Sequence, residues 1–254
     1  MKFVTWNING GYGLNSENPQ QLLGHENLDY FTRELELIDA DVVCLQEVHV
    51  NSKRSQAYEV AESLGYPFVF ESAASESHID SNFQLANAIL AKQAFQATHC
   101  LTLPQPHFPL NLPLLASGKH AIIHDKVLQV VQLNGLTVGN THLLPLHILG
   151  AQWDSVEGRE LAAYIAETIR VELQTPLVLC GDFNYSNVSE LMPELMKSLI
   201  LTDALPNEPS LPHSDTRIDY ILISEGLEVH SSEIVRCYAD HFPCAVVLKT
   251  PLAT

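Results

Sequence analysis

The sequence predicts an α/β protein in which helices cover mixed or antiparallel β-sheets. Strand-like apolar runs outnumber the segments with helical spacing, and many neighbouring runs have no helix between them. The chain has 254 residues, enough for one domain with a sizeable core but short for two. Because no internal repeat or linker divides it, we expect a single domain over residues 1–254.

The expected elements follow from apolar spacing and turn residues. Strands are predicted at 2–6, 42–46, 67–71, 85–90, 127–133, 136–141, 176–180, 218–223 and 243–248. Helices are predicted at about 26–38, 55–64 and 151–172, with a shorter one near 189–200. The proline-rich stretch 103–115 is expected to form an extended loop, since proline neither continues a helix nor enters a central strand.

Composition and charge limit the partners. Hydrophobic residues make up 46% and charged residues 17% of the chain, which is typical of a folded protein. Thirteen Lys and Arg against 30 Asp and Glu give a net charge of −17. Long nucleic acid is therefore a disfavoured partner, because binding to its backbone depends on clustered Lys and Arg. A local basic pocket stays open as an alternative.

The same inspection gives expectations for location and for cysteine chemistry. No apolar run is long enough for a membrane span, and the N-terminus has no signal-peptide pattern, so we expect a cytoplasmic protein. The five cysteines include no C-x-x-C pair, which argues against a disulfide framework or a zinc site. Three of them lie within apolar runs and are expected to be buried thiols: Cys44, Cys180 and Cys244.

Polar side chains gather at the boundaries of the predicted strands. Each one alone has a structural explanation, as a turn residue, a solvated strand end or a core histidine. Together they place carboxylates, amides and imidazoles where one rim of a mixed sheet could collect them. The residues are Asn7, Glu47, His142, Asp182 and Asn184 after strands, and Asp219, Asp240 and His241 at or before strand starts.

These residue types indicate metal-assisted hydrolysis. Oxygen-rich ligand sets suit hard cations such as Mg²⁺ or Mn²⁺ and not zinc. Such an ion commonly binds one or two carboxylates together with a substrate phosphate. A histidine beside a carboxylate can act as a general base, because the carboxylate fixes its tautomer. The set therefore predicts hydrolysis of a phosphate ester.

At these residues the chain resembles the endonuclease/exonuclease/phosphatase superfamily, also called the DNase I-like fold. The matching motifs occur in the order of the family and span essentially the whole chain. They are TWNING (5–10), LQEVH (45–49), ANAIL (86–90), GNTHLLP (139–145), GDFN (181–184), TRIDYIL (216–222) and ADHFP (239–243). The resemblance implies a four-layer sandwich of two packed mixed β-sheets flanked by helices, with the site at one end of the sheets.

The resemblance also implies roles for the rim residues. Glu47 and Asn7 match metal ligands, and Asp240 matches a second ligand of metal or water. The residues that match the catalytic set are His241 with its partner Asp219, His142 at the scissile phosphate, and Asp182 with Asn184. Either the Asp219–His241 pair or Asp182 could activate water, so the general base stays open. Asn9 and Asn87 are expected to contact substrate.

The departures from the family motifs bear on substrate. Asn9 stands where DNA-repair members often have aspartate, and Ala91 stands where many relatives have serine. Lys119 and His120 lie near a position at which relatives commonly have arginine. The expected substrate is accordingly a small phosphate monoester or diester of a lipid head group, sugar or nucleotide, hydrolysed by a monomer. The alternatives are a nuclease or a tyrosyl-DNA phosphodiesterase. A non-catalytic scaffold is a third, disfavoured because every core motif position is filled.

Overall fold

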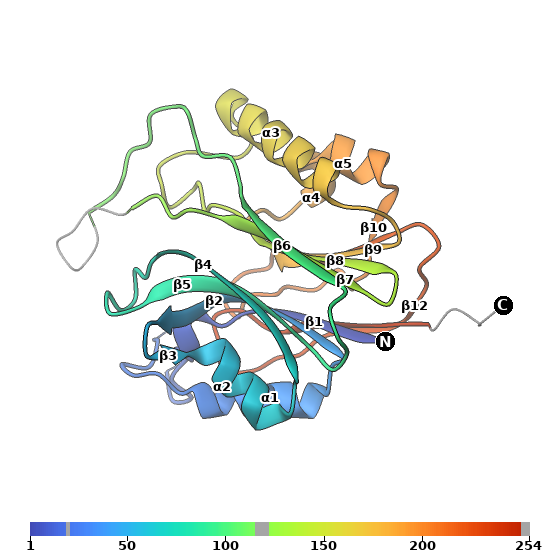
Figure 1. The fold of residues 1–254 in the computed structure, drawn as a ribbon. Helices are drawn as coiled ribbons and strands as arrows, with labels where there is room; N and C mark the ends of the chain where they lie inside the picture. The colour runs from blue at the N-terminus through green and yellow to red at the C-terminus, as the bar shows by residue number, and fades with distance from the viewer. Residues whose placement is uncertain (19–20, 115–121, 250–254) are drawn as a thin grey trace.

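A computed structural model describes residues 1–18, 21–114 and 122–249. Two β-sheets pack face to face, and helices cover the outer face of each (Figure 1). The chain therefore forms four layers, helix, sheet, sheet and helix, which confirms the fold class expected from the sequence. No helix among the described residues is long and apolar enough to cross a membrane.

The first sheet is built around a parallel central pair, β1 (Lys2–Asn7) and β2 (Val42–Asn51). Its strand order is β12-β13-β1-β2-β5-β4, and β3 pairs with β2 beside this path. The other strands are β3 (Arg54–Ser55), β4 (Phe68–Glu76), β5 (Gln84–Ala91), β12 (Val229–Ile234) and β13 (Cys244–Leu248). Helices α1 (Leu28–Ile38) and α2 (Gln56–Leu64) cover this sheet (Figure 1).

The second sheet has the order β10-β11-β9-β8-β7-β6, with β8 and β9 parallel at its centre. Its strands are β6 (Ala97–Thr102), β7 (Val127–Leu133), β8 (Leu136–His142), β9 (Leu177–Asp182), β10 (Leu201–Asp203) and β11 (Asp219–Ser224). Helices α3 (Val156–Glu172), α4 (Val188–Leu191) and α5 (Pro193–Ser198) cover its outer face (Figure 1).

Each predicted strand is present, but some boundaries and four further strands were missed. β3, β6, β10 and β12 were not predicted; β6 is mostly exposed and β3 has two residues, so neither has a strong apolar pattern. Helix α3 begins at Val156, later than expected, because Ser155 caps it by accepting a hydrogen bond from the Gly158 amide. The short helix expected near 189–200 is two helices, separated where Pro193 begins the second.

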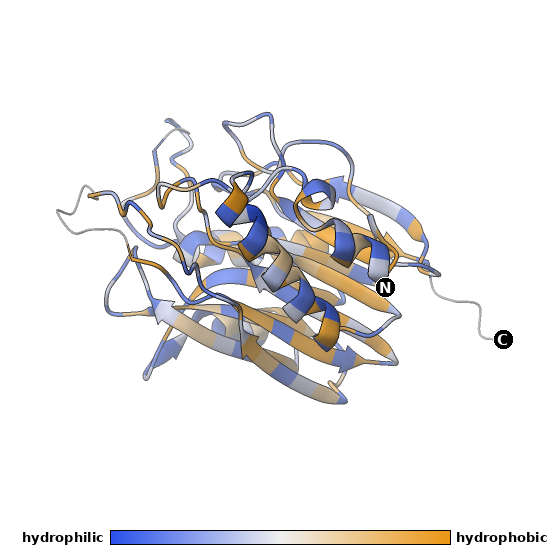
Figure 2. Ribbon diagram, turned by 90° about the horizontal axis from the view of Figure 1, so that it is seen from above, coloured by the Kyte–Doolittle hydropathy of each residue, from blue (hydrophilic) through white to orange (hydrophobic). Residues whose placement is uncertain are grey.

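Apolar side chains fill the space between the layers. Leu161, Ile165 and Ile169 are buried on the inner face of α3, and in Figure 2 this helix carries both hydrophobic and hydrophilic residues. Cys44, Cys180 and Cys244 lie in the core between the two sheets, and all three are free thiols, as expected. The stretch from 103 to 114 has no regular helix or strand, in agreement with the predicted loop.

A buried cluster of amides joins the central strands of the two sheets. The Asn140 amide on β8 donates to the Leu45 carbonyl (3.0 Å), the Ala88 carbonyl (3.2 Å) and Gln129 Oε1 (3.0 Å). Its own oxygen accepts a hydrogen bond of 2.7 Å from Gln46. We call these three side chains, Gln46, Gln129 and Asn140, the amide cluster. It fixes how β2 and β5 lie against β8.

The Asn140→Ala variant should lower the free energy of unfolding by about 2–4 kcal/mol, because three buried acceptors would each lose a donor. Urea denaturation followed by circular dichroism would measure the change. Asn207→Ala, in an exposed loop, is the control and should leave the midpoint unchanged. Equal midpoints for the two variants would show that the amide cluster does not hold the sheets together.

Candidate active site at one end of the sheets

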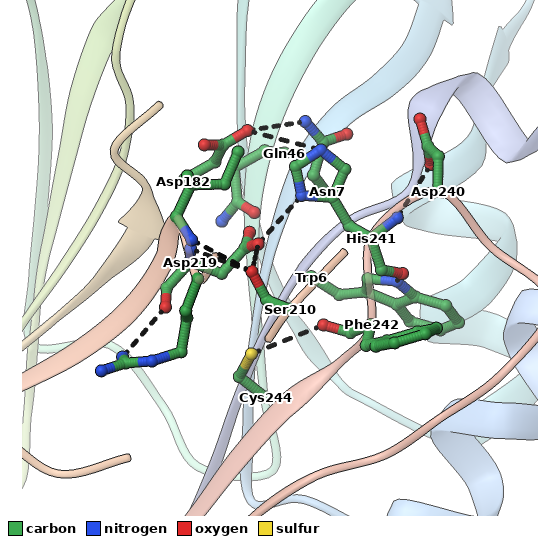
Figure 3. A network of polar contacts seen from close by, with 12 residues as sticks. Trp6, Asn7, Gln46, Asp182, Ser210, Asp219, Asp240, His241, Phe242 and Cys244 are labelled. Carbon is green, nitrogen blue, oxygen red and sulfur yellow. Dashed lines mark hydrogen bonds and ion pairs between the residues drawn. The ribbon is translucent and has the colours of Figure 1, made fainter. Parts of the chain in front are cut away.

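The predicted site residues come together where the two parallel pairs end. Asn7 ends β1, His142 ends β8 and Asp182 ends β9. The sheet register places Asp182 opposite both His142 on β8 and Asp219 at the start of β11. Figure 3 shows the side chains of Asn7, Asp182, Asp219 and His241 directed toward one another. The strand ends and strand starts thus meet at one rim.

Glu47 does not end its strand as expected, because β2 continues to Asn51. The register of β2 against β5 shifts between Leu45 and Val48, so that Gln46 and Glu47 oppose the single residue Asn87. Glu47 has a φ of 55°, which is costly for a residue other than glycine. Such bulges re-aim a side chain beside an active site. The strand continues because the bulge, rather than a turn, accommodates Glu47.

Asp182 is held by its surroundings in a defined orientation. The preceding Gly181 packs so tightly against β8 that a Cβ there would lie 2.1 Å from the Thr141 carbonyl oxygen. One Asp182 oxygen accepts the Asn184 backbone amide (2.8 Å) and the other the Asn7 side-chain amide (3.2 Å). Burial raises the pKa of Asp182 to about 7; the positive His241 opposes this and Asp219 adds to it.

Asn184 follows Asp182 in a left-handed conformation, with a φ of 49°. Asparagine tolerates this conformation better than most residues. Its side-chain amide donates to the Leu143 carbonyl at 2.9 Å. Asn184 therefore shapes the turn after β9. Its side-chain oxygen takes no part in the hydrogen bond to Leu143.

His241 and Asp219 form a close pair. His241 Nδ1 lies 2.9 Å from Asp219 Oδ2, and its Nε2 lies 3.8 Å from Asp182. Burial alone would lower the pKa of His241, but Asp219 and then Asp182 outweigh it and raise the pKa well above the ordinary value. Trp6 Nε1 donates to the His241 carbonyl (2.8 Å), which anchors the segment before β13 (Figure 3).

Ser210 belongs to the same network and was missed in the sequence. Its hydroxyl donates to Asp219 Oδ2 (2.6 Å) and accepts the Ile218 amide (3.1 Å), and the residue is fully buried. A serine between prolines in an irregular segment gives no signal of this role. Among the described residues, no group hydrogen-bonds the other Asp219 oxygen, Oδ1. Part of the negative charge of the Asp219 carboxylate therefore has no hydrogen-bond donor among the described residues.

Asp240 sits beside this group without entering the His241–Asp219 pair. Its Oδ1 accepts the backbone amide of His241 (3.1 Å), and its pKa is raised to about 6 by burial and by the charge of Glu47, against the lowering effect of His241. A buried carboxyl whose pKa is raised by a neighbouring carboxylate favours a bound cation.

Lys126 is a second residue that the sequence analysis missed. It is buried just before β7, and its ammonium nitrogen lies 3.1 Å from both ring nitrogens of His142. Burial lowers the pKa of Lys126 to about 8 although Glu47 and Asp182 raise it. Burial and then Lys126 hold the pKa of His142 well below its ordinary value, so His142 is neutral at pH 7. A single lysine before an apolar run gives no sequence signal.

The two predicted substrate contacts lie at the same rim. Asn9 is buried and left-handed, and its backbone amide donates to the Asn7 side chain (3.0 Å). Asn87 is 5% exposed and lies opposite Glu47; among the described residues nothing hydrogen-bonds its Nδ2. Lys119 and His120 lie outside the described residues.

The donor chemistry of this rim fits a divalent cation. Asp182, Asp219 and His241 offer ligand atoms within 4.8 Å of one another. Two of the possible ligand atoms, His241 Nδ1 and Asp219 Oδ2, already bond to each other. Glu47 and Asp240 add carboxylates, and Asn7 an amide oxygen. Buried oxygens with raised pKa values form the kind of site that a hard cation stabilises.

The two-sheet fold and this acidic rim with its paired histidine define a phosphoesterase class. A sequence model of the endonuclease/exonuclease/phosphatase family matches residues 4–244, and the chain belongs to that family. Its members are hydrolases that act on phosphate esters with divalent metals.

Known proteins share the fold and part of the sequence. The chain is 28% identical over 174 residues to Protein angel homolog 2 of Danio rerio, a match that covers 66% of this chain and 29% of that protein. An endonuclease/exonuclease/phosphatase from Beutenbergia cavernae superposes with a TM-score of 0.70 at 18% identity, over 98% of this chain and 71% of that one. The mannosyl-6-phosphatase Bt3783 of Bacteroides thetaiotaomicron gives 0.62 at 16% identity, over 98% and 100%.

The pKa of Asp240 leads to a stability prediction for the metal-free protein. A carboxyl whose folded pKa of about 6 exceeds the unfolded value binds more protons when folded, so stability falls as the pH rises from about 4 through 6. Asp240→Asn removes this loss. The variant should gain about 1–2 kcal/mol on the parent between pH 4 and pH 7, measured by urea denaturation with EDTA.

Manganese should reverse this difference, because the ion favours the ionised carboxylate and stabilises the parent more than the variant. Asp215→Asn, at an exposed loop position, is the control and should follow the parent with and without metal. A pH-independent difference between Asp240→Asn and the parent would contradict the assignment of Asp240 to a buried, charged rim.

Proposed function

We propose that this protein is a Mg²⁺- or Mn²⁺-dependent hydrolase that cleaves a phosphomonoester or phosphodiester bond with activated water. The observation that carries the proposal is the convergence of Asp182, Asp219 and His241, with ligand atoms within 4.8 Å, at the strand ends. In this proposal Glu47, Asn7 and Asp240 would hold the ion, and the chemistry that it would supply is stabilisation of negative charge on the phosphate.

The remaining residues have proposed roles that follow from their contacts. Asn184 and the Asn7 amide orient Asp182 through its two oxygens. His142, kept neutral by burial and Lys126, contacts the scissile phosphate together with the Lys126 ammonium. The side-chain amide of Asn87, which has no hydrogen-bond partner among the described residues, donates to a phosphoryl oxygen. Asn9, whose backbone amide donates to the Asn7 side chain, contacts the substrate beside it. These roles supply donors around a phosphate and one oriented acceptor for the proton of water.

For the general base we favour Asp182 over His241. The pKa of His241 is raised well above its ordinary value, so the ring is an imidazolium at pH 7 and has no free lone pair. It can then stabilise charge on the phosphoryl group. Asp182 Oδ2 lies between the two histidines, 3.6 Å from His142 Nε2 and 3.8 Å from His241 Nε2. Accepting the proton of water at Asp182 fits this division.

The substrate we propose is small: a phosphate ester of a sugar, lipid head group or nucleotide. A net charge of −17 opposes binding to a long nucleic-acid backbone. A nuclease or tyrosyl-DNA phosphodiesterase is the alternative, and it predicts salt-sensitive binding to oligonucleotides. A single-domain chain, a monomeric state and a cytoplasmic location remain predictions from the sequence.

The first test is metal-dependent turnover. With Mn²⁺ the protein should hydrolyse at least one of p-nitrophenyl phosphate, bis-p-nitrophenyl phosphate or a panel of sugar and nucleotide phosphates, and EDTA should abolish the activity. Glu47→Gln should lower kcat/KM at least about 100-fold, whereas the exposed Glu233→Gln on β12 should not change it. Absence of metal-dependent turnover on every ester would reject the proposal.

The base assignment has its own test in the pH profile of kcat/KM. If His241 acts as the imidazolium, Asp219→Asn should move the alkaline limb to lower pH, since it removes the carboxylate that raises the pKa of His241. The same variant should cost about 10²–10⁴-fold in kcat. If the Asp219–His241 pair is the base, the acid limb should move to lower pH instead, which would overturn the assignment to Asp182.

A further inference from the structure

Two histidines outside the catalytic group face each other at the same end of the sheets. His78 lies in the loop between β4 and β5, and His124 lies just before β7; both segments reach the end of the sheets where the site lies (Figure 1). Their ring centroids are 5.3 Å apart, with the rings tilted by 62°. His124 lies two residues before Lys126, whose ammonium nitrogen is 3.1 Å from the His142 ring. The pair therefore borders the catalytic rim.

The loop that carries His78 is held in place by the residues on either side. The Ser77 hydroxyl bonds His49 Nε2 (2.8 Å) and accepts the backbone amides of Ile79 (3.1 Å) and Asp80 (3.2 Å). The Phe83 ring stacks on His49 at 4.9 Å with an interplanar angle of 6°. His49 is itself fully buried against Gly10, where a Cβ would lie 2.5 Å from its ring.

The segment that carries His124 is fixed as well. The Asp125 amide donates to Ser75 Oγ (2.6 Å) on β4, which joins this segment to the strand that leads to His78. Gln105 donates to the Asp125 carboxylate (2.8 Å) and to the His124 carbonyl (3.4 Å). The one acidic side chain next to His124 in sequence is thereby engaged by Gln105. Both imidazoles thus sit on anchored backbone, which lowers the entropic cost of binding a ligand.

One ring nitrogen of the pair is buried without a hydrogen-bond partner in the part of the chain that the structure describes. His124 Nδ1 is buried, and among the described residues no group hydrogen-bonds it. Burial, then Lys126 and His78, lower the pKa of His124 to about 4, so the ring is neutral at pH 7 and presents one N–H. Lys126 lies two residues further along and touches His142. In a chain with a net charge of −17, these nitrogens form a local group of donors.

We propose that His78 and His124 form a second phosphate-binding subsite beside the scissile phosphate, and that Lys126 is shared by the two phosphates, so that the preferred substrate carries two phosphoryl groups. The class is a bisphosphate or diphosphate ester, of which one phosphate is cleaved and the other is bound by the imidazoles. This inference rests on the proposed function for the cleaved phosphate, but the subsite itself can be tested without turnover.

The test measures anion binding by the metal-free protein at pH 7 in EDTA. Isothermal titration calorimetry with inorganic pyrophosphate and with inorganic phosphate should give at least tenfold tighter binding of pyrophosphate. The His78→Ala/His124→Ala double variant should lose about tenfold or more of the pyrophosphate affinity, since it removes two donors to a charged group. His230→Ala, at an exposed position on β12, is the matched control and should bind both anions as the parent does.

A spectroscopic measurement on the unchanged protein guards against a folding defect in the variant. Imidazole nitrogen NMR during a pyrophosphate titration should show His124 and His78 shifting, while His230 stays constant. Equal affinity of the parent for the two anions, an unchanged affinity in the double variant, or constant His78 and His124 signals would each overturn the subsite.

Kinetics then connects the subsite to catalysis. For the double variant, kcat/KM should fall at least tenfold more for a sugar bisphosphate than for p-nitrophenyl phosphate; equal losses would overturn the substrate class. If the protein binds pyrophosphate through the two histidines but hydrolyses no ester, the proposed function fails and the anion subsite stands.

Discussion

The amide cluster of Gln46, Gln129 and Asn140 is the interaction on which the site geometry depends. The site draws residues from both sheets, Glu47 and Asn7 from one and Asp182 and His142 from the other. Apolar packing between sheets is non-directional and tolerates small shifts. Hydrogen bonds from Asn140 to Leu45 and Ala88 are directional, and they hold the strands on both sides of the Glu47 bulge. Hence the contacts that set the distance across the rim are made by Asn140, two residues before His142 on β8.

The rim itself stores unfavourable electrostatics. Burial raises the pKa of Asp182 to about 7 and of Asp240 to about 6, and the left-handed Glu47 adds backbone strain of about 1–3 kcal/mol. His241 and the hydrogen bonds to Asp182 offset only part of the cost of burial, because both pKa values stay raised. The folded core must supply the rest. Neighbouring groups at the rim have pKa values shifted in different ways, upward for Asp182 and His241 and downward for His142. Such differences assign some groups as proton acceptors and others as fixed charges. A bound cation would offset the charge of the carboxylates, and a bound phosphate would pair with the neighbouring nitrogen donors.

The sequence predicted the class of the fold and the residues at strand ends because both follow from local pattern. Apolar runs end on polar residues, and the order of motifs covers the chain, so Asn7, Asp182 and His241 could be named. The bulge at Glu47 could not be predicted, since a two-against-one register depends on the partner strand. Ser210 and Lys126 were missed for a related reason. Each gains its role only when a segment distant in sequence folds beside it, as Ser210 does with Asp219.

The arrangement of charge around the rim narrows what the protein can bind. Acidic groups gather where Glu47, Asp182 and Asp240 meet, and nitrogen donors gather on the adjacent side, at His142, Lys126 and His124. Lys126 belongs to both sides, because Glu47 and Asp182 raise its pKa while its ammonium contacts the His142 imidazole. A phosphate between these two sides would face a cation on one and neutral or positive donors on the other. The long-range field of a chain with a net charge of −17 repels polyanions, but it is screened over about 8 Å at physiological salt. A small, highly charged ester held within that distance of the rim experiences chiefly the local donors, and this favours compact phosphate esters over a long nucleic-acid strand.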